Sequence, residues 1–354
     1  MDGGLMSSER EIRAAITMLG DAGNERIGTD IAEFGIEEAV ARWKSGIGPK
    51  EIATRFPRAL NGVGKQFDRL NSLGGRFVIP GDREWPQQLG DLDYGAPVGL
   101  WLRGAGDLSN LSNRMMAIVG ARAATSYGER IASELAAQAA GSHITTISGA
   151  AYGIDAAAHR GSLAGGGATV AVLACGIDVA YPAAHSGLLE RIAETGLVVS
   201  EAALGASPHK RHFLVRNRLI AALSSSTVVV EAALRSGSLS TGNWATSLGR
   251  DVWGVPGPMS SASSAGVHVG IQEGSFRIMT DYNDVLKCYP NEHFPSLGLV
   301  EDIVIVALRE APMNAERIAL RAAGICSQTD IQAVLTLLEV TNRAVHDVNG
   351  WTLI

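Results

Sequence analysis

The chain has 354 residues, of which 46% are hydrophobic and 19% are charged, and its formal net charge is −6. This length suits a globular protein of about two or three domains, and the acidic balance argues against a surface coated with nucleic acid. A local basic site stays compatible with that balance. The three cysteines, Cys175, Cys288 and Cys326, form neither a CxxC pattern nor a Cys/His cluster. We therefore expect no disulfide framework, no metal site and a reducing, cytoplasmic environment.

Charged residues interrupt the long apolar stretches of the sequence. Glu9, Arg10 and Arg13 break up the first 30 positions, and the apolar run that begins at Ala168 meets Asp178. A signal peptide needs an uninterrupted apolar segment, and a membrane-spanning helix needs about 20 apolar residues. We therefore expect neither of them, and no membrane partner.

Residues 1–75 predict a separate helical domain, because apolar residues recur with helical spacing at 9–19 and 36–43. The segment 56–65 reads Phe-Pro-Arg-Ala-Leu-Asn-Gly-Val-Gly-Lys. Glycines between two helical stretches resemble a helix–hairpin–helix, whose turn offers backbone N–H groups to a phosphate. A plain glycine-containing connection between two helices is an equally good interpretation. Gln66 stands where a Walker A loop needs Ser or Thr, so that loop is excluded.

Residues 76–290 predict the main domain, an α/β fold with an extended Rossmann-like, doubly wound and mostly parallel sheet. Short strands near 76–79 and 98–102 come first, and strands then alternate with helices. The later strands are almost continuous apolar runs, as expected where helices cover both faces of a parallel sheet. We expect those strands at 115–119, 144–148, 168–173, 197–200, 226–231 and 252–255, and helices near 127–140, 154–164, 185–194, 214–223 and 241–249.

Residues 291–354 predict a winged-helix domain of three helices and a hairpin. Helical spacing covers 300–308, 314–322 and 330–340, and Asn349-Gly350 between alternating residues is a strong hairpin signal. Acidic residues outnumber the arginines of this segment, which is unfavourable for binding a DNA duplex. We expect a protein-contact or regulatory module.

Two glycine turns follow the first two parallel strands. The first contains Gly120 but lacks the later glycines of a dinucleotide-binding fingerprint, so hydride transfer is not indicated. Arg122 stands beside the N-terminus of the next helix, where free N–H groups and a guanidinium suit a phosphate; an ordinary surface arginine is the alternative. In the second turn, Gly149 allows a ligand to approach the backbone closely. Asp155 and His159 could suggest acid–base chemistry, but a structural hydrogen bond is the preferred interpretation.

The strongest signal lies in residues 207–218, which contain four basic residues and no acid. Lys210 and Arg211 precede Phe213, and Arg216 and Arg218 follow it. Basic residues for the phosphates and an aromatic ring for a base face are typical of proteins that bind single strands without reading sequence. The alternative is a solvated basic loop with the phenylalanine turned into the core.

A loop rich in Ser and Gly follows the expected strand at 226–231. It contains Ser236, Gly237, Ser238 and Thr241. These residues could cap the next helix or hold a phosphate.

Taken together, these segments resemble the DNA-processing protein A family (DprA, also called Smf). The resemblance covers about residues 76–285 and rests on motifs that follow the family's order: IVGAR, SGAAYGIDAAAH, GATVAVLACGIDVAYP, RNRLIAALS, VVVEA, SGSLST and GRDVWGVPG. It implies a non-catalytic, cytoplasmic homodimer without a cofactor. It also implies sequence-independent binding of single-stranded DNA, protection of that DNA, and loading of the RecA recombinase during natural transformation and recombination.

The resemblance further implies which residues contact DNA. They are Arg122, Lys210, Phe213, Arg216, Asn217 and Arg218, together with residues of the neighbouring turns, Gly120, Gly149, Ser236, Gly237, Ser238 and Thr241. The sequence departs from the family's pattern at Ala121, at Ala150-Ala151 and over residues 266–271.

Two other hypotheses stay open. The fold is related to that of nucleoside-monophosphate phosphoribohydrolases, enzymes with a PGG-x-GT loop and a catalytic glutamate. Here Ser236-Gly237-Ser238 stands in place of that loop, and Glu231 alone is a weak substitute for the glutamate. The third hypothesis keeps the DNA chemistry but places it in replication or repair, independent of competence.

Overall fold

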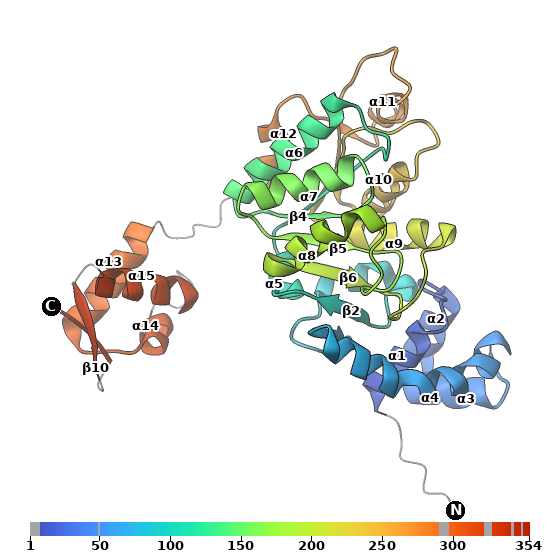
Figure 1. Cartoon of the computed structure of the whole chain (residues 1–354), viewed down its shortest axis with the longest axis horizontal. Helices are drawn as coiled ribbons and strands as arrows, with labels where there is room; N and C mark the ends of the chain where they lie inside the picture. Colours follow the sequence, from blue (N-terminus) through green and yellow to red (C-terminus); the bar gives the residue numbers. More distant parts are fainter. Residues whose placement is uncertain (1–7, 49, 290–296, 322–327, 341–342, 348–349) are drawn as a thin grey trace, which may run out of the picture. The chain divides into compact units, whose positions relative to one another are not determined.

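The computed structural model describes residues 8–48, 50–289, 297–321, 328–340, 343–347 and 350–354 (Figure 1). The chain divides into two compact units, Met1–Tyr289 and Pro290–Ile354. The first unit contains the N-terminal helices and the large sheet, and the second contains the C-terminal helices and a hairpin. A further division of the first unit near residue 75 stays a prediction.

Nine strands of the described residues form one sheet in the first unit, in the order β1-β2-β6-β5-β4-β3-β7-β8-β9. Neighbouring strands from β6 to β9 run parallel, whereas β1 and β2 are antiparallel additions at one side. The strands are β1 (Gly75–Val78), β2 (Leu100–Arg103), β3 (Met115–Val119), β4 (Thr145–Ser148), β5 (Thr169–Val172), β6 (Leu197–Ser200), β7 (Ser226–Val229), β8 (Asp251–Gly254) and β9 (Arg277–Ile278).

Helices cover both faces of this sheet (Figure 1). Met116 and Ile118 of β3 pack with α6 and α7 on one face, and Met115 and Ala117 pack with α9 and α10 on the other. Since both faces are buried, the strands are apolar at consecutive positions, and the predicted doubly wound, mostly parallel sheet is confirmed. The helices of this layer are α5 (Leu108–Ser112), α6 (Ser126–Gly141), α7 (Ile154–Ala164), α8 (Ser186–Thr195), α9 (Lys210–Leu223), α10 (Ser238–Ser247), α11 (Ala265–Gln272) and α12 (Tyr282–Leu286), with the 3-10 helices η1 (Gln87–Gly95) and η2 (Ala183–His185).

Two of these helices begin earlier than the sequence predicts. As a result, candidate site residues that were expected in loops lie in the first turns of helices. α9 begins at Lys210 rather than near 214, and α10 begins at Ser238 rather than near 241. The segment from Lys210 to Phe213 contains neither Gly nor Pro, so no residue in it opposes a helix. Lys210 and Phe213 therefore lie in the first turn of a helix and not in a loop.

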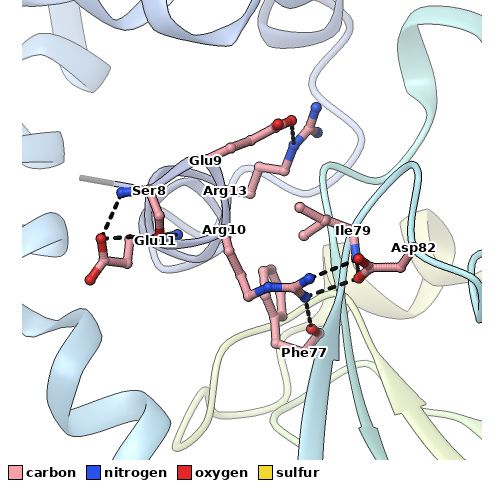
Figure 2. A network of polar contacts seen from close by, with 8 residues as sticks. All are labelled: Ser8, Glu9, Arg10, Glu11, Arg13, Phe77, Ile79 and Asp82. Carbon is pink, nitrogen blue, oxygen red and sulfur yellow. Dashed lines mark hydrogen bonds and ion pairs between the residues drawn. The ribbon is translucent and has the colours of Figure 1, made fainter. Parts of the chain in front are cut away.

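Four helices form the N-terminal layer: α1 (Glu9–Thr17), α2 (Glu25–Phe34), α3 (Ile36–Lys44) and α4 (Lys50–Ser72). Arg10 of α1 donates to both carboxylate oxygens of Asp82, at 2.9 and 2.7 Å (Figure 2). Arg13 donates to the Val98 carbonyl at 3.0 Å. Because Asp82 follows β1 and Val98 precedes β2, these bonds dock α1 against the antiparallel side of the sheet.

The sequence predicts a glycine turn within residues 56–65, either in a helix–hairpin–helix or in a plain connection between helices. Both predictions are wrong. α4 continues through Gly62 and Gly64 as one helix of 23 residues. Its buried residues, Ile52, Phe56, Ala59, Val63 and Leu70, recur at helical spacing on one face. Each glycine costs a helix about 1 kcal/mol relative to alanine, and burial of these larger side chains outweighs that cost.

A substitution in α4 tests this continuity. A Cβ on Gly64 would meet no atom within 4 Å, so Gly64→Ala gains helix propensity without a clash. We expect chemical denaturation to show an increase of about 0.5–1 kcal/mol in the free energy of unfolding. Gly62→Ala is the matched control, since its Cβ would lie 3.0 Å from Cε of Met18 and gain less. A Gly64→Ala variant that is less stable than the natural protein would contradict a continuous helix and indicate a turn at this glycine.

The second unit consists of α13 (Leu297–Glu310), α14 (Ala315–Arg321), α15 (Gln328–Val340) and an antiparallel hairpin, β10 (Ala344–Asp347) with β11 (Gly350–Leu353). Trp351 of β11 also forms a bridge with Met313, between α13 and α14. Val304, Ile318 and Leu335 are fully buried in its core. The order of these elements is that of the expected winged helix, and the assignment stays a proposal. Asn349 of the predicted hairpin turn lies outside the described residues.

Candidate nucleic-acid interface

The carboxyl ends of β3 to β8 share one edge of the sheet, because these strands run parallel. β3 has β4 on one side and β7 on the other, so the strand order reverses between β3 and β7. Ligands of open α/β sheets bind beyond the carboxyl ends, at such a reversal. The turns that carry Arg122, Gly149 and Ser236 all begin at this edge.

A carboxylate of the chain itself approaches the N-terminus of α6, the helix end where the sequence predicts a phosphate site. Glu231, just after β7, accepts hydrogen bonds from the Thr125 backbone N–H at 2.9 Å and the Thr125 hydroxyl at 2.6 Å. Gly128 permits this approach, because a Cβ there would lie 2.6 Å from Cδ of Glu231. Glu231 therefore engages the Thr125 N–H and hydroxyl at this helix end, and a phosphate site beside Arg122 stays a prediction.

The second glycine turn is also held from within the chain. Asp155 accepts from the N–H groups of Gly149, at 3.2 Å, and Ala151, at 3.3 Å. Burial raises the pKa of Asp155, while the Arg216 guanidinium and these hydrogen bonds oppose the increase. His159 contacts the Thr169 hydroxyl at 2.7 Å and not Asp155, so both residues have structural hydrogen bonds but do not pair with each other. Burial lowers the pKa of His159 to about 3, so the ring is neutral at physiological pH.

Arg216 lies directly beneath this turn. Its guanidinium donates to the Val172 carbonyl and occupies the space that a side chain at Gly149 would need. Burial lowers the pKa of Arg216 to about 10, against the effect of Asp155, so the group keeps its charge at neutral pH. Arg216 therefore shapes the turn from below.

Arg218 is taken up by a buried ion pair. It donates to both carboxylate oxygens of Glu201 at 2.8 Å, and its Nε donates to the Gly95 carbonyl at 2.9 Å. The Arg218 side chain is only 3% exposed. Arg218 thus connects α9 to the end of β6 and to η1, at a distance from solvent.

The other residues of the basic run lie on the surface. Lys210 and Arg211 are exposed in the first turn of α9, although a helix dipole disfavours cations at that end. The Arg122 guanidinium, also exposed, lies over the Phe213 ring at 4.6 Å from its centroid. This geometry is a cation–π contact, and it joins the first turn after β3 to α9.

The helices α7, α8, α9 and α10 begin at this edge without a side-chain cap, in contrast to α6, where the Thr125 side chain caps the helix. Of these, α9 carries the basic run. Asn217 of α9 donates to the Gly237 carbonyl at 3.1 Å and so holds the loop before α10 against α9. The Ser236 and Ser238 hydroxyls lie 2.7 Å apart in that loop. Thr241 is buried and supports α10 from within.

The structure thus divides the candidate residues into two sets. Those that reach the surface of the edge are Arg122, Lys210, Phe213, Ser236, Gly237 and Ser238. Those that lie beneath it or shape its turns are Gly120, Gly149, Arg216, Asn217, Arg218 and Thr241. Sequence reasoning missed two exposed rings on the same edge, Tyr152 and Tyr181. Tyr152 and Tyr181 lie in the segments that follow the predicted strands at 144–148 and 168–173, and that position was the available signal.

One edge of this doubly wound α/β sheet carries exposed cations, an aromatic ring and uncapped helix N-termini. These features are typical of α/β proteins that bind phosphate-containing ligands. Comparison with known proteins specifies this class further: the family model for DNA recombination-mediator protein A matches residues 76–290. The chain belongs to this family.

Individual relatives agree. The DNA processing protein DprA of Streptococcus pneumoniae is 42% identical over 224 residues, which are 63% of this chain and 76% of that protein. The X-ray structure of DprA from Streptococcus pneumoniae matches with a TM-score of 0.67 at 31% identity, over 80% of this chain and 98% of that one. The structure that describes the single-stranded DNA binding mode of DNA processing protein A from Helicobacter pylori matches with a TM-score of 0.54 at 25% identity, over 60% of this chain and 95% of that one.

No helix in the described part of the chain has the length and apolar character that crossing a membrane requires.

Proposed function

We propose that this chain binds single-stranded DNA, without sequence preference, at the carboxyl edge of its sheet. The observation that carries the proposal is the contact between exposed Arg122, in the turn after β3, and half-buried Phe213 on α9, beside the uncapped N-termini of α9 and α10. Cations for phosphates and a ring for base faces are the components of such a site. Family membership and the single-stranded DNA binding mode of the Helicobacter pylori relative support it.

Each surface residue has a role in this proposal. Lys210 and the N–H groups and hydroxyls of Ser236-Gly237-Ser238 hold phosphates, and Phe213 stacks on a base. In the free protein Arg122 covers one face of the Phe213 ring. A base that stacks on this face replaces the guanidinium, which then pairs with a phosphate. Arg216, Asn217, Arg218 and Thr241 act from beneath as positioning residues, and Gly120 and Gly149 keep the turns close to the sheet.

We further propose that the protein acts in the cytoplasm as a homodimer, protects single-stranded DNA and loads RecA on it during transformation and recombination. Family membership supports this role. Light scattering tests the dimer, and RecA-dependent strand exchange on DNA precoated with a single-strand-binding protein tests loading. A competence-independent role in repair would use the same site with other partners.

The position of Glu231 does not support the alternative hypothesis of a nucleoside-monophosphate phosphoribohydrolase. Its carboxylate is 3% exposed and holds the Thr125 N–H and hydroxyl. A general acid or base must reach the bond that reacts. Release of free base from AMP or CMP by the purified protein would restore the enzymatic hypothesis.

Salt dependence tests the proposed phosphate contacts. We expect fluorescence anisotropy with labelled oligo-dT to show a steep decrease in affinity as salt rises, because counterions are released from the strand. Lys210→Ala should reduce the slope of log K against log salt by about 0.7. Arg191→Ala, an exposed arginine on α8, is the matched control and should leave the slope unchanged. A flat salt response of the natural protein would contradict phosphate binding.

A further inference from the structure

Tyr152 and Tyr181 expose their rings on the same edge and have no role in the site described so far. Tyr152, in the turn after β4, is 50% exposed, and Tyr181, in the segment after β5, is 41% exposed. Neither hydroxyl bonds to another described residue, whereas those of Tyr127, Tyr282 and Tyr289 do. The fold therefore gains little from either ring, and both keep apolar surface in water.

Both rings are continuous with the proposed interface. The Tyr181 ring centroid lies 5.5 Å from that of Phe213, with a tilt of 48°. The Tyr152 ring lies 4.8 Å from that of His185, with a tilt of 67°. His185 follows Tyr181 by four residues, and its Nδ1 lies 2.9 Å from the Ala150 carbonyl oxygen, next to the turn that carries Tyr152. Since the Tyr152 and His185 rings meet edge to face and the Tyr181 and Phe213 rings are tilted, neither pair stacks flat, and ring surface stays available to another flat group.

No exposed carboxylate interrupts these two segments. Asp178, the one acid of residues 173–185, has a side chain that is 3% exposed. It pairs with Arg69 and accepts from the Gly205 N–H at 2.8 Å. Asp155 is buried beneath the other turn. A polyanion can therefore follow the rings without passing an unpaired negative charge.

The order of the three rings along the sheet suits successive nucleotides. Tyr152, Tyr181 and Phe213 follow β4, β5 and β6, which are neighbours in the sheet. Neighbouring strands lie about 4.8 Å apart, and stacked nucleotides rise about 3.4 Å each along one strand. A strand that is partly unstacked on protein rings is longer per nucleotide, so that adjacent turns can receive adjacent bases.

We propose that Tyr181 and Tyr152 are two further base-stacking positions, so that three successive bases pack on Phe213, Tyr181 and Tyr152. This inference rests on the proposed function and specifies its ligand as a single strand of at least three nucleotides. Recognition uses ring faces, which every base provides, so it carries no sequence preference.

The test compares two strands of equal length, an oligo-dT and the same sugar–phosphate chain with abasic sites in place of the thymines. We expect Tyr181→Ala and Tyr152→Ala to weaken binding of oligo-dT by roughly 5- to 150-fold each, the loss of one stacked base. Binding of the abasic strand should not change. Tyr181→Phe and Tyr152→Phe should bind oligo-dT like the natural protein, and the salt slope should stay unchanged in all four variants.

The outcomes separate this inference from the proposed function. If the natural protein does not bind oligo-dT, the proposed function fails. If it binds oligo-dT and both alanine variants bind equally well, the base-stacking role of the tyrosines fails and the proposed function stands. Equal weakening of oligo-dT and of the abasic strand would also overturn the inference, since it would show that the tyrosines only support the fold.

Discussion

The double variant Arg122→Ala/Phe213→Ala is expected to lose single-stranded DNA binding while it keeps its fold. A stacked base contributes about 1–3 kcal/mol, and a phosphate contact adds to it, so affinity should decrease at least about a hundredfold. Arg122 is exposed and Phe213 is half-buried at the edge, and the two side chains contact each other through the cation–π pair. Their removal opens no buried cavity, and we expect the melting temperature to change little.

The two single variants complete a double-mutant cycle. Because the residues touch, their effects should not add. Arg122→Ala removes a phosphate contact but uncovers a face of the Phe213 ring for a base. It should therefore reduce DNA affinity less than the double variant does. Arg191→Ala on α8 is the control for a lost exposed arginine. A double variant that binds oligo-dT like the natural protein would refute the site.

Glu201→Gln is expected to destabilise the protein by about 3–5 kcal/mol, because it leaves the Arg218 charge buried without its partner. The pair is among the most buried in the described residues, with side chains 3% and 9% exposed. Arg218 also joins separate parts of the first unit: a Cβ on Gly23, between α1 and α2, would lie 3.0 Å from its Nε. Chemical denaturation measures the loss.

The double variant Glu201→Gln/Arg218→Met is the control for this pair. It removes both charges, so it should regain much of the lost stability. At a temperature where both variants are folded, DNA affinity should stay within a few-fold of the natural protein, since Arg218 has a positioning role. A large loss of affinity in a folded double variant would instead place Arg218 in direct contact with DNA.

The sheet and its helices could be predicted because their pattern is strong. Residues 115–119 and 226–229 are apolar or small at every position, and only a strand covered on both faces fits such short runs between helices. α4 could not be predicted as one helix, since two glycines in three residues favour a turn locally. Its continuity depends on packing around Phe56 and Val63, which involves residues distant in sequence.

The division of the basic run could not be read from the sequence either. In the sequence Lys210 and Arg218 are two members of one basic run, and only the packing of α9 decides that Arg218 is buried and Lys210 exposed. Glu201 is 17 residues from Arg218, and their pairing depends on how β6 and α9 pack. In the same way, Glu231 reaches Thr125 across 106 residues, so this contact at the N-terminus of α6 has no local sequence signal.

Competition between single-stranded and duplex DNA tests the central claim most directly. Labelled oligo-dT bound to the natural protein would be displaced by unlabelled oligo-dT or by a duplex of equal length, and anisotropy would follow the release. We expect efficient displacement by the single strand and weak displacement by the duplex, whose paired bases cannot stack on Phe213. Equal displacement by both would contradict a site built around ring–base stacking and would indicate binding through the phosphates alone.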